Sequence, residues 1–308
     1  MTISFADVAW EQYQEWIQSD SKMIERINEL IKQTSRDPFK GIGKPESLKG
    51  DLRGFWSRRI NHEHRLVYRF SKGNLEIISC KYHYWFFMTL EANLKFLKTL
   101  AKNNNREWFE KNKPKYLAVK GNFDDFLEAF HAELIKFDES LVGLNPRKMG
   151  FRIYRDVRFS KDKSPYKINM GAGFSAGGKM MQEPGYYVHL QPNNQSFLAG
   201  GFYMPDVEML SKIRQEIDYT STGFGKILSD KKFKKTFPKG LDDFDKLKTA
   251  PKGYPKDHPQ LDWLKHKSFI VSHPFTDKEV ADKKFVKKVA ECCKTLKPLN
   301  DFLKESIE

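Results

Sequence analysis

His64-Arg65-Leu66-Val67-Tyr68-Arg69-Phe70 decides the fold of the first part of this 308-residue chain. Successive residues of a strand point to opposite faces of a sheet, so a strand with one buried face alternates in polarity. One face of this stretch holds Leu66, Tyr68 and Phe70, and the other holds Arg65, Val67 and Arg69. The stretch therefore predicts a strand that packs one face on a core and presents two arginines on the other.

Two further strands are predicted beside it, over Phe55–Ile60, where the alternation is only rough, and over Leu75–His83. Before them, Thr2–Phe5 predicts a short strand. Two helices follow it, one capped by Asp7 and running to about Gln18, the other running from Ser21 to about Thr34. This order predicts an α+β domain in which a small antiparallel sheet is backed by two N-terminal helices.

The predicted sheet brings together residues that can cleave RNA. Three adjacent antiparallel strands would put Arg59, Arg65 and His83 on one face, and Glu46 lies in the preceding loop. A carboxylate can remove the proton of a ribose 2′-OH, guanidinium groups match phosphate oxygens, and an imidazole can protonate the leaving 5′-oxygen. Tyr84 can stack on an unpaired base. Each residue also has a plainer interpretation as a solvated carboxylate, a surface cation or a structural side chain, and the residues alone leave both open.

Composition sets bounds on partners and compartment. The chain has 54 Lys and Arg against 40 Asp and Glu, a net charge of +14, of which residues 1–84 carry +3. A basic surface favours polyanions such as RNA or the ribosome without indicating a preferred sequence. The three cysteines form no disulfide or metal pattern, which indicates a reducing cytoplasm. Neither a signal peptide nor an apolar run long enough to cross a membrane is expected.

Six motifs within residues 1–84 carry a family resemblance. They are Ile27-Asn28-Glu29-Leu30-Ile31-Lys32, Gly43-Lys44-Pro45-Glu46, Leu48-Lys49, Gly54-Phe55-Trp56-Ser57-Arg58-Arg59-Ile60, Glu63-His64-Arg65-Leu66-Val67-Tyr68 and Tyr82-His83-Tyr84. Through them residues 1–84 closely resemble the YoeB toxins, members of the RelE group of bacterial ribosome-dependent mRNA interferases. The resemblance covers the whole length of such a toxin and implies a RelE-like sheet.

The resemblance also implies a mechanism. The implied roles are general base for Glu46, general acid for His83, transition-state stabilisation for Arg59 and Arg65, and positioning of the RNA for Lys49 and Tyr84. It implies cleavage without a metal or other cofactor, mRNA in the ribosomal A site as substrate, and a YefM-type antitoxin as inhibitor. One feature departs from the family: free YoeB toxins stop at the final His-Tyr, whereas this chain continues through the apolar residues 85–88.

Residues 85–308 predict a second, larger and separate α+β domain. Helices are predicted over Leu90–Ala101, from Arg106, over Asn122–Phe137, from Pro205 to about Tyr219, and over 283–305. Strands are predicted over 168–175, 185–191, 195–203 and Ser268–Ser272. The segments Asn104–Phe109, Arg155–Lys167 and Gly185–Leu190 resemble a widespread bacterial family of unknown function, recognisable by RDVRFSKDK-x-PYK, which brings no activity with it.

One segment of this second domain, Phe151–Lys167, is dense in cations and aromatic rings. Its cations, among them Arg155, Arg158 and Lys161, can grip a nucleic-acid backbone while rings stack on bases. The rings available are Tyr154, Phe159 and Tyr166. The alternative is a salt-bridge network of Arg155, Asp156 and Arg158 that holds a turn, and both interpretations stay open. His189 is predicted to share a strand face with Tyr187, which is more typical of a structural histidine than of a ligand.

The sequence thus predicts a fusion of a toxin domain, residues 1–84, with an α+β domain of unknown role, residues 85–308. The predicted activity is ribosome-dependent endoribonuclease cleavage that leaves a 2′,3′-cyclic phosphate and a 5′-OH. The alternative is a catalytically silent fusion in which residues 85–88 block the site. In that case the basic second domain would bind nucleic acid or a protein partner.

Overall fold

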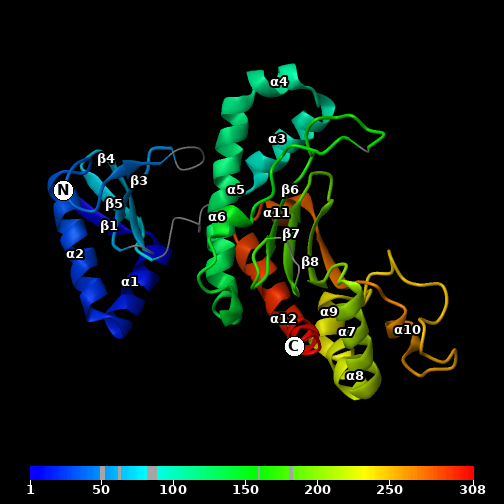
Figure 1. Cartoon of the computed structure of the whole chain (residues 1–308). Coiled ribbons are helices and arrows are strands. Elements are labelled where there is room, and N and C mark those ends of the chain that lie inside the picture. The colour runs from blue at the N-terminus through cyan, green and yellow to red at the C-terminus, as the bar shows by residue number, and fades with distance from the viewer. Residues whose placement is uncertain (49–52, 62–63, 82–88, 159, 180–182) are drawn as a thin grey trace. The chain divides into compact units, whose positions relative to one another are not determined.

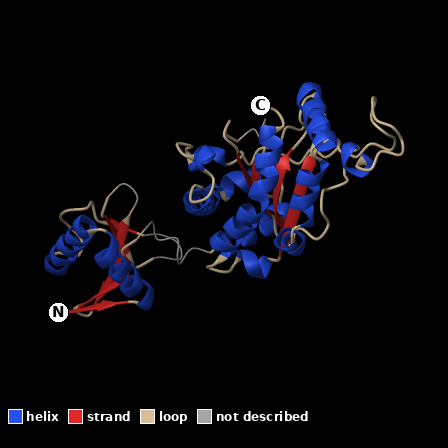
Figure 2. Cartoon of the chain, turned by 90° about the horizontal axis from the view of Figure 1, so that it is seen from below, coloured by secondary structure: helices blue, strands red, loops and turns tan. Residues whose placement is uncertain are grey.

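The computed structural model describes residues 1–48, 53–61, 64–81, 89–158, 160–179 and 183–308. The chain divides into two compact units, Met1–Met88 and Thr89–Glu308. Figures 1 and 2 show that each unit has its own sheet with helices packed against it. The predicted boundary after residue 84 falls within residues 82–88, outside the described residues.

The first unit has the predicted order of elements with one addition, because Glu46, which was expected in a loop, belongs to a two-residue strand, β2. They are β1 (Thr2–Phe5), α1 (Asp7–Ser19), α2 (Ser21–Arg36), β2 (Glu46–Ser47), β3 (Trp56–Arg59), β4 (Arg65–Ser71) and β5 (Asn74–Ser79). The strands lie in the order β1-β5-β4-β3-β2. The pairs among β2 to β5 are antiparallel, whereas β1 pairs with β5 in parallel. Two helices and three strands lie between β1 and β5 in sequence, a connection long enough for a parallel pair.

One face of this sheet packs on α1 and α2. Leu66 and Tyr68 of β4 are fully buried there with Ile27 and Leu30 of α2, as the alternation predicted. Burial of such apolar side chains is the main source of stability in a small domain. The N-cap of α1 differs from the prediction: it is Ala6, with no side-chain cap, and Asp7 is the first helical residue, where a carboxylate still favours the helix dipole.

The second unit contains a four-stranded sheet and most of the helices. Its elements are α3 (Glu91–Lys102), α4 (Arg106–Lys111), α5 (Lys113–Leu134), a 3-10 turn (Glu139–Leu141), α6 (Pro146–Met149), β6 (Met170–Phe174), β7 (Gly185–Leu190), β8 (Ser196–Phe202), α7 (Val207–Tyr219), α8 (Ser221–Ser229), α9 (Lys231–Thr236), α10 (Leu261–Leu264), β9 (Phe269–Phe275), α11 (Asp277–Val280) and α12 (Phe285–Glu305). The sheet is antiparallel throughout, in the order β6-β7-β8-β9.

The two faces of this second sheet differ. On β7, Tyr186, Val188 and Leu190 are buried on the face that α12 covers. Gly200 of β8 belongs to the same face, since a Cβ atom on it would lie 2.0 Å from Leu296 Cδ2 of α12. The opposite face, which carries Tyr187, is only half-buried. The sheet is therefore covered by a helix on one side and partly open on the other.

Two predicted helix starts in this unit were wrong. The helix expected from Asn122 begins at Lys113, because Pro114 sits in the first turn, where its missing N–H costs nothing. Pro205 lies before the helix that it was expected to open, since Asp206 is the N-cap and accepts a bond from Met209 N. The α+β class of both units is confirmed. Among the described residues, no helix is long and apolar enough to cross a membrane.

Candidate functional site

The candidate site lies on the face of the first sheet that points away from α1 and α2. Glu46 of β2 pairs with Ser57 of β3, and Arg59 of β3 pairs with Arg65 of β4. Paired residues share a face, and so do alternate residues of one strand, such as Ser57 and Arg59. Glu46, Arg59 and Arg65 therefore lie on one face, on three neighbouring strands.

The two arginines are directly opposite each other, with Cβ atoms about 5 Å apart in such a pair. Two like charges in register concentrate positive potential at one point of the sheet surface. Arg59 and Glu46 are exposed, whereas Arg65 is half-buried and its Nε and Nη1 atoms are buried, so Arg59 is the solvent-accessible member of the pair. A phosphate, which guanidinium forks match in geometry, is the kind of group that the pair suits.

A strained turn sets the position of Glu46. Gly43 has φ +78° and Lys44 has φ +50°, both in the left-handed region that favours glycine. A Cβ atom on Gly43 would lie 2.8 Å from Leu30 Cδ2 and 3.0 Å from Arg59 O, so only glycine fits there. Arg59 N donates to Gly43 O at 2.6 Å. The turn thus fastens the chain to β3 three residues before Glu46.

Arg58, next to the predicted site residue Arg59, is fully buried and belongs to the scaffold. Its guanidinium donates to the carbonyl oxygens of Asp37 at 2.5 Å, Lys40 at 2.7 Å and Ile42 at 2.9 Å. Its Nε donates to Tyr68 Oη at 3.3 Å, and Tyr68 in turn donates to Pro38 O. Arg58 therefore holds the 37–42 loop, which leads into Glu46, against the sheet.

The sequence reasoning missed Arg58 although the signal was present. Phe55–Ile60 alternates only roughly because Trp56 and Arg58 both point to the helix side, so a charged residue occupies a core position. Of the predicted toxin residues, Glu46, Arg59 and Arg65 come together on one face. Lys49, His83 and Tyr84 lie outside the described residues, and their roles stay predictions.

The cations predicted to grip nucleic acid in the second unit are largely engaged with neighbouring carboxylates. Arg155 pairs with Asp162, and Arg158 pairs with Asp156 at 2.7 Å. Lys161 is exposed. The alternative of a salt-bridge network is thus the better description of this loop, although Arg155 pairs with Asp162 rather than with Asp156.

The predicted stacking rings of this loop are also partly used. Tyr166 is 3% exposed and stacks on Phe109 with ring centroids 3.9 Å apart, so it is unavailable to a base. Tyr154 is 46% exposed. Phe159 lies outside the described residues. The loop is closed by a bond from Lys167 N to Ile153 O at 2.7 Å, which turns its end toward β6.

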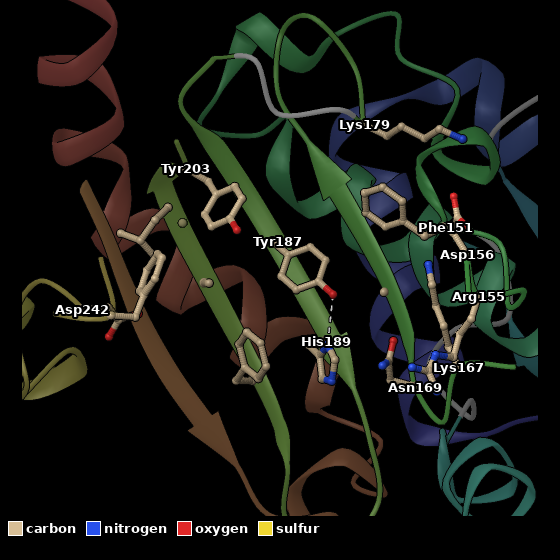
Figure 3. A pocket seen from close by; sticks show the side chains of 16 residues that line it. Phe151, Arg155, Asp156, Lys167, Asn169, Lys179, Tyr187, His189, Tyr203 and Asp242 are labelled. Carbon is tan, nitrogen blue, oxygen red and sulfur yellow. Dashed lines mark hydrogen bonds between the residues drawn. The ribbon is translucent and has the colours of Figure 1, made fainter. Parts of the chain in front are cut away.

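A pocket of about 890 Å³ lies on the open face of the second sheet (Figure 3). Sequence reasoning did not identify it, because its lining comes from segments far apart in the chain. Tyr187 and His189 of β7 lie in the middle of the view, Lys167 and Lys179 on one side, and Asp242 on the other. The volume is within the range of small-molecule sites.

Tyr187 and His189 form a polar row on the floor of this pocket. Tyr187 Oη lies 2.9 Å from His189 Nδ1, and His189 Nε2 lies 3.0 Å from Gln191 Oε1. Since the amide oxygen can only accept, Nε2 carries the proton and Nδ1 accepts from the tyrosine hydroxyl. Burial lowers the pKa of His189 below its ordinary value. Both ring nitrogens are used, which fits the structural histidine that the sequence predicted.

Comparison with known proteins identifies both parts of the chain. Residues 5–84 match the model of the YoeB-like toxin of bacterial type II toxin-antitoxin system. Toxin YoeB of Streptomyces coelicolor is 55% identical over 84 residues, which are 27% of this chain and 100% of that protein. Toxin YoeB of Escherichia coli is 50% identical over the same share of each chain.

A solved structure also matches this part: the heterotetrameric YoeB-YefM toxin-antitoxin complex from Staphylococcus aureus. It has 52% identity and a TM-score of 0.26, and the match covers 27% of this chain and 98% of that one. Residues 92–302 match the model of a family described as conserved hypothetical protein (DUF2461). The chain therefore belongs to the YoeB toxins through residues 5–84 and to this second family through residues 92–302, as a fusion of the two.

Proposed function

We propose that this protein is a ribosome-dependent mRNA endoribonuclease of a type II toxin-antitoxin system. Its YoeB-type domain cleaves mRNA in the ribosomal A site through attack of a ribose 2′-OH on the adjacent phosphate. The observation that supports this is the strand register that brings Glu46, Arg59 and Arg65 onto one face of the sheet. A carboxylate beside two phosphate-matching cations is the chemistry that such an attack requires.

Each residue has one role in the proposed reaction. Glu46 takes the proton of the 2′-OH, and the oxygen attacks the phosphorus atom. Arg59 and Arg65 stabilise the charge that builds on the phosphoryl oxygens. His83 gives a proton to the leaving 5′-oxygen, so the products carry a 2′,3′-cyclic phosphate and a 5′-OH. Lys49 and Tyr84 hold the RNA. The proposed reaction needs no metal ion, because its nucleophile is the 2′-OH of the substrate and not a metal-bound water.

The test is cleavage of ribosome-bound mRNA by the full chain. We expect Glu46→Gln to slow cleavage by a factor of about 10²–10⁴, the usual contribution of a general base. Glu25→Gln changes another exposed carboxylate, on α2, and should leave the rate unchanged. An mRNA with a 2′-deoxyribose at the cleavage position should resist the protein. Cleavage of that substrate, or full activity of Glu46→Gln, would remove the proposed mechanism.

A second arm compares the full chain with residues 1–84 alone, which correspond to the whole length of the Streptomyces coelicolor toxin. Cleavage by both would mean that the fused second domain leaves the site accessible. Cleavage by residues 1–84 only would favour the silent fusion, in which the second domain carries the function.

The proposed inhibitor is a YefM-type antitoxin, since the Staphylococcus aureus YoeB, at 52% identity, is found in a complex with YefM. Co-expression of that YefM with the full chain should relieve growth arrest, and the two proteins should co-purify. Growth arrest that persists despite abundant YefM would contradict this partner.

A further inference from the structure

The pocket of the second unit is built into the sheet by small residues. Gly171 of β6 and Ala199 of β8 lie on the pocket face, opposite His189 and Tyr187 of β7. A Cβ atom on Gly171 would lie 2.6 Å from Tyr187 Oη, so the tyrosine ring lies flat across the strand only because residue 171 is glycine. The result is a hollow with an aromatic floor that no described element fills.

One side of the pocket is lined by charged residues with a cationic excess: Lys167, Lys179 and Arg155, with Asp156 as the one acid among them. Lys167 is half-buried, with Nζ 5.7 Å from the centre of the Phe151 ring, and Lys179, in the loop after β6, lines the upper edge of the pocket (Figure 3). Neither lysine forms an ion pair with a carboxylate of the described residues. Burial, followed by the charge of Arg152, lowers the pKa of Lys167. An anion bound there would offset both effects.

The opposite side offers a flat apolar surface and one acceptor. Tyr203 and Phe244 are 51% and 60% exposed and stack on each other with ring centroids 5.9 Å apart. Asp242 lies beside them, and its carboxylate accepts from Ser272 Oγ at 3.1 Å, which leaves lone pairs for a ligand. This side therefore suits a flat ring system that carries an amino or hydroxyl donor.

The two sides lie at opposite edges of the four-stranded sheet, since Lys167 precedes β6 and Asp242 N bonds Ile270 O of β9. Three strand spacings of about 4.8 Å separate those edges by roughly 14 Å. A ligand that uses both sides must be that long, with an acid at one end and a ring at the other. A simple aromatic acid is too short.

We propose that this pocket binds a nucleoside phosphate, either free or at the 5′ end of an RNA strand. The phosphate lies against Lys167, on the side of the pocket that Lys179 also lines, and the base lies on Tyr203 and Phe244 with a base or ribose donor on Asp242. This site is independent of the proposed nuclease activity, because it lies wholly within the other unit.

The test uses the full chain with Glu46→Gln, which stops the proposed cleavage, and measures binding by calorimetry. The probes are the four ribonucleoside 5′-monophosphates, adenosine, inorganic phosphate, and one short RNA with and without a 5′-phosphate. We expect at least one monophosphate to bind about tenfold or more tightly than either adenosine or phosphate. Tight binding of the phosphorylated RNA would identify a strand end as the source, and its absence a free nucleotide.

Two variants test the contacts with the two ends of the ligand one at a time. Lys167→Ala should weaken monophosphate binding about tenfold and leave adenosine unchanged, because it removes a charged donor. Phe244→Ala should weaken both by about tenfold, the scale of one lost stacking partner. Lys98→Ala, an exposed lysine of α3, is the matched control, and thermal melting checks that each variant is folded. Absence of monophosphate binding at millimolar concentration, or binding that neither variant changes, would overturn the proposal.

Discussion

Arg58→Met tests whether the buried Arg58 holds the 37–42 loop against the sheet of the toxin domain. Methionine is similar in length and can stay buried, but it donates no hydrogen bonds. The four bonds that Arg58 donates would be lost, and at about 1 kcal/mol each they sum to about 4 kcal/mol. The buried charge disappears with them, which recovers part of its desolvation cost. We expect a net loss of about 2–4 kcal/mol in the free energy of unfolding of this unit.

The measurement is hydrogen–deuterium exchange of the full chain, because it reports the free energy of opening for each segment separately. Protection should fall across β3, β4 and β5, and most in the 37–47 loop. Arg59→Met is the matched control: Arg59 is exposed, so its loss should change stability by less than about 0.5 kcal/mol while it lowers cleavage. If Arg58→Met changes stability by less than about 1 kcal/mol, the loop is held by something else and the reasoning fails.

Three shorter predictions follow from other sites. Arg65→Gln should lower cleavage of ribosome-bound mRNA at least tenfold, measured as initial rates, since it removes one of the two paired guanidinium groups. Gly201→Ala should destabilise the second unit by about 2–4 kcal/mol in urea unfolding, because φ is +118° and a Cβ atom would lie 1.9 Å from Phe269 O. Burial lowers the pKa of both His189 and His266 below 6.5, so the unfolded chain binds protons more readily. Stability of the second unit should therefore fall as pH drops from about 7.5 to 5, and His189→Gln should flatten that profile; a pH-independent stability would show that the two rings are not buried in the neutral form.

Much of the fold follows from local patterns in the sequence. The alternation in β4 identified the buried face of the first sheet, and the helical spacing of Ile27 and Leu30 identified the face of α2 that meets it. In the second unit, the strand patterns located β6 to β9, and the alternation of Tyr187 with its neighbours gave the correct faces of β7. These features depend on residues close in sequence, which is why they were predictable.

The site in the toxin domain needed more than pattern. Glu46 lies in a strand of only two residues, and no periodicity can be read from so short a stretch. Its place beside β3 depends on the Gly43 turn and on Arg58, which bonds a loop up to 21 residues earlier in the chain. The family resemblance indicated the residues, whereas the physical reason for their arrangement is a tertiary network.

In the basic segment of the second unit, local charge density does not show which cations have carboxylate partners. Arg155 and Arg158 attracted the prediction because they are close in sequence, yet Asp156 and Asp162 are equally close and pair with them. Arg155 also lines the pocket of the second unit, but it pairs with Asp162, whereas Lys167, at the end of the same segment, lines the pocket without a carboxylate partner among the described residues. A cation is available to a ligand when the fold separates it from acidic side chains, and that separation is a property of the sheet rather than of the segment. The charge that matters is therefore the one that the neighbouring sequence does not neutralise.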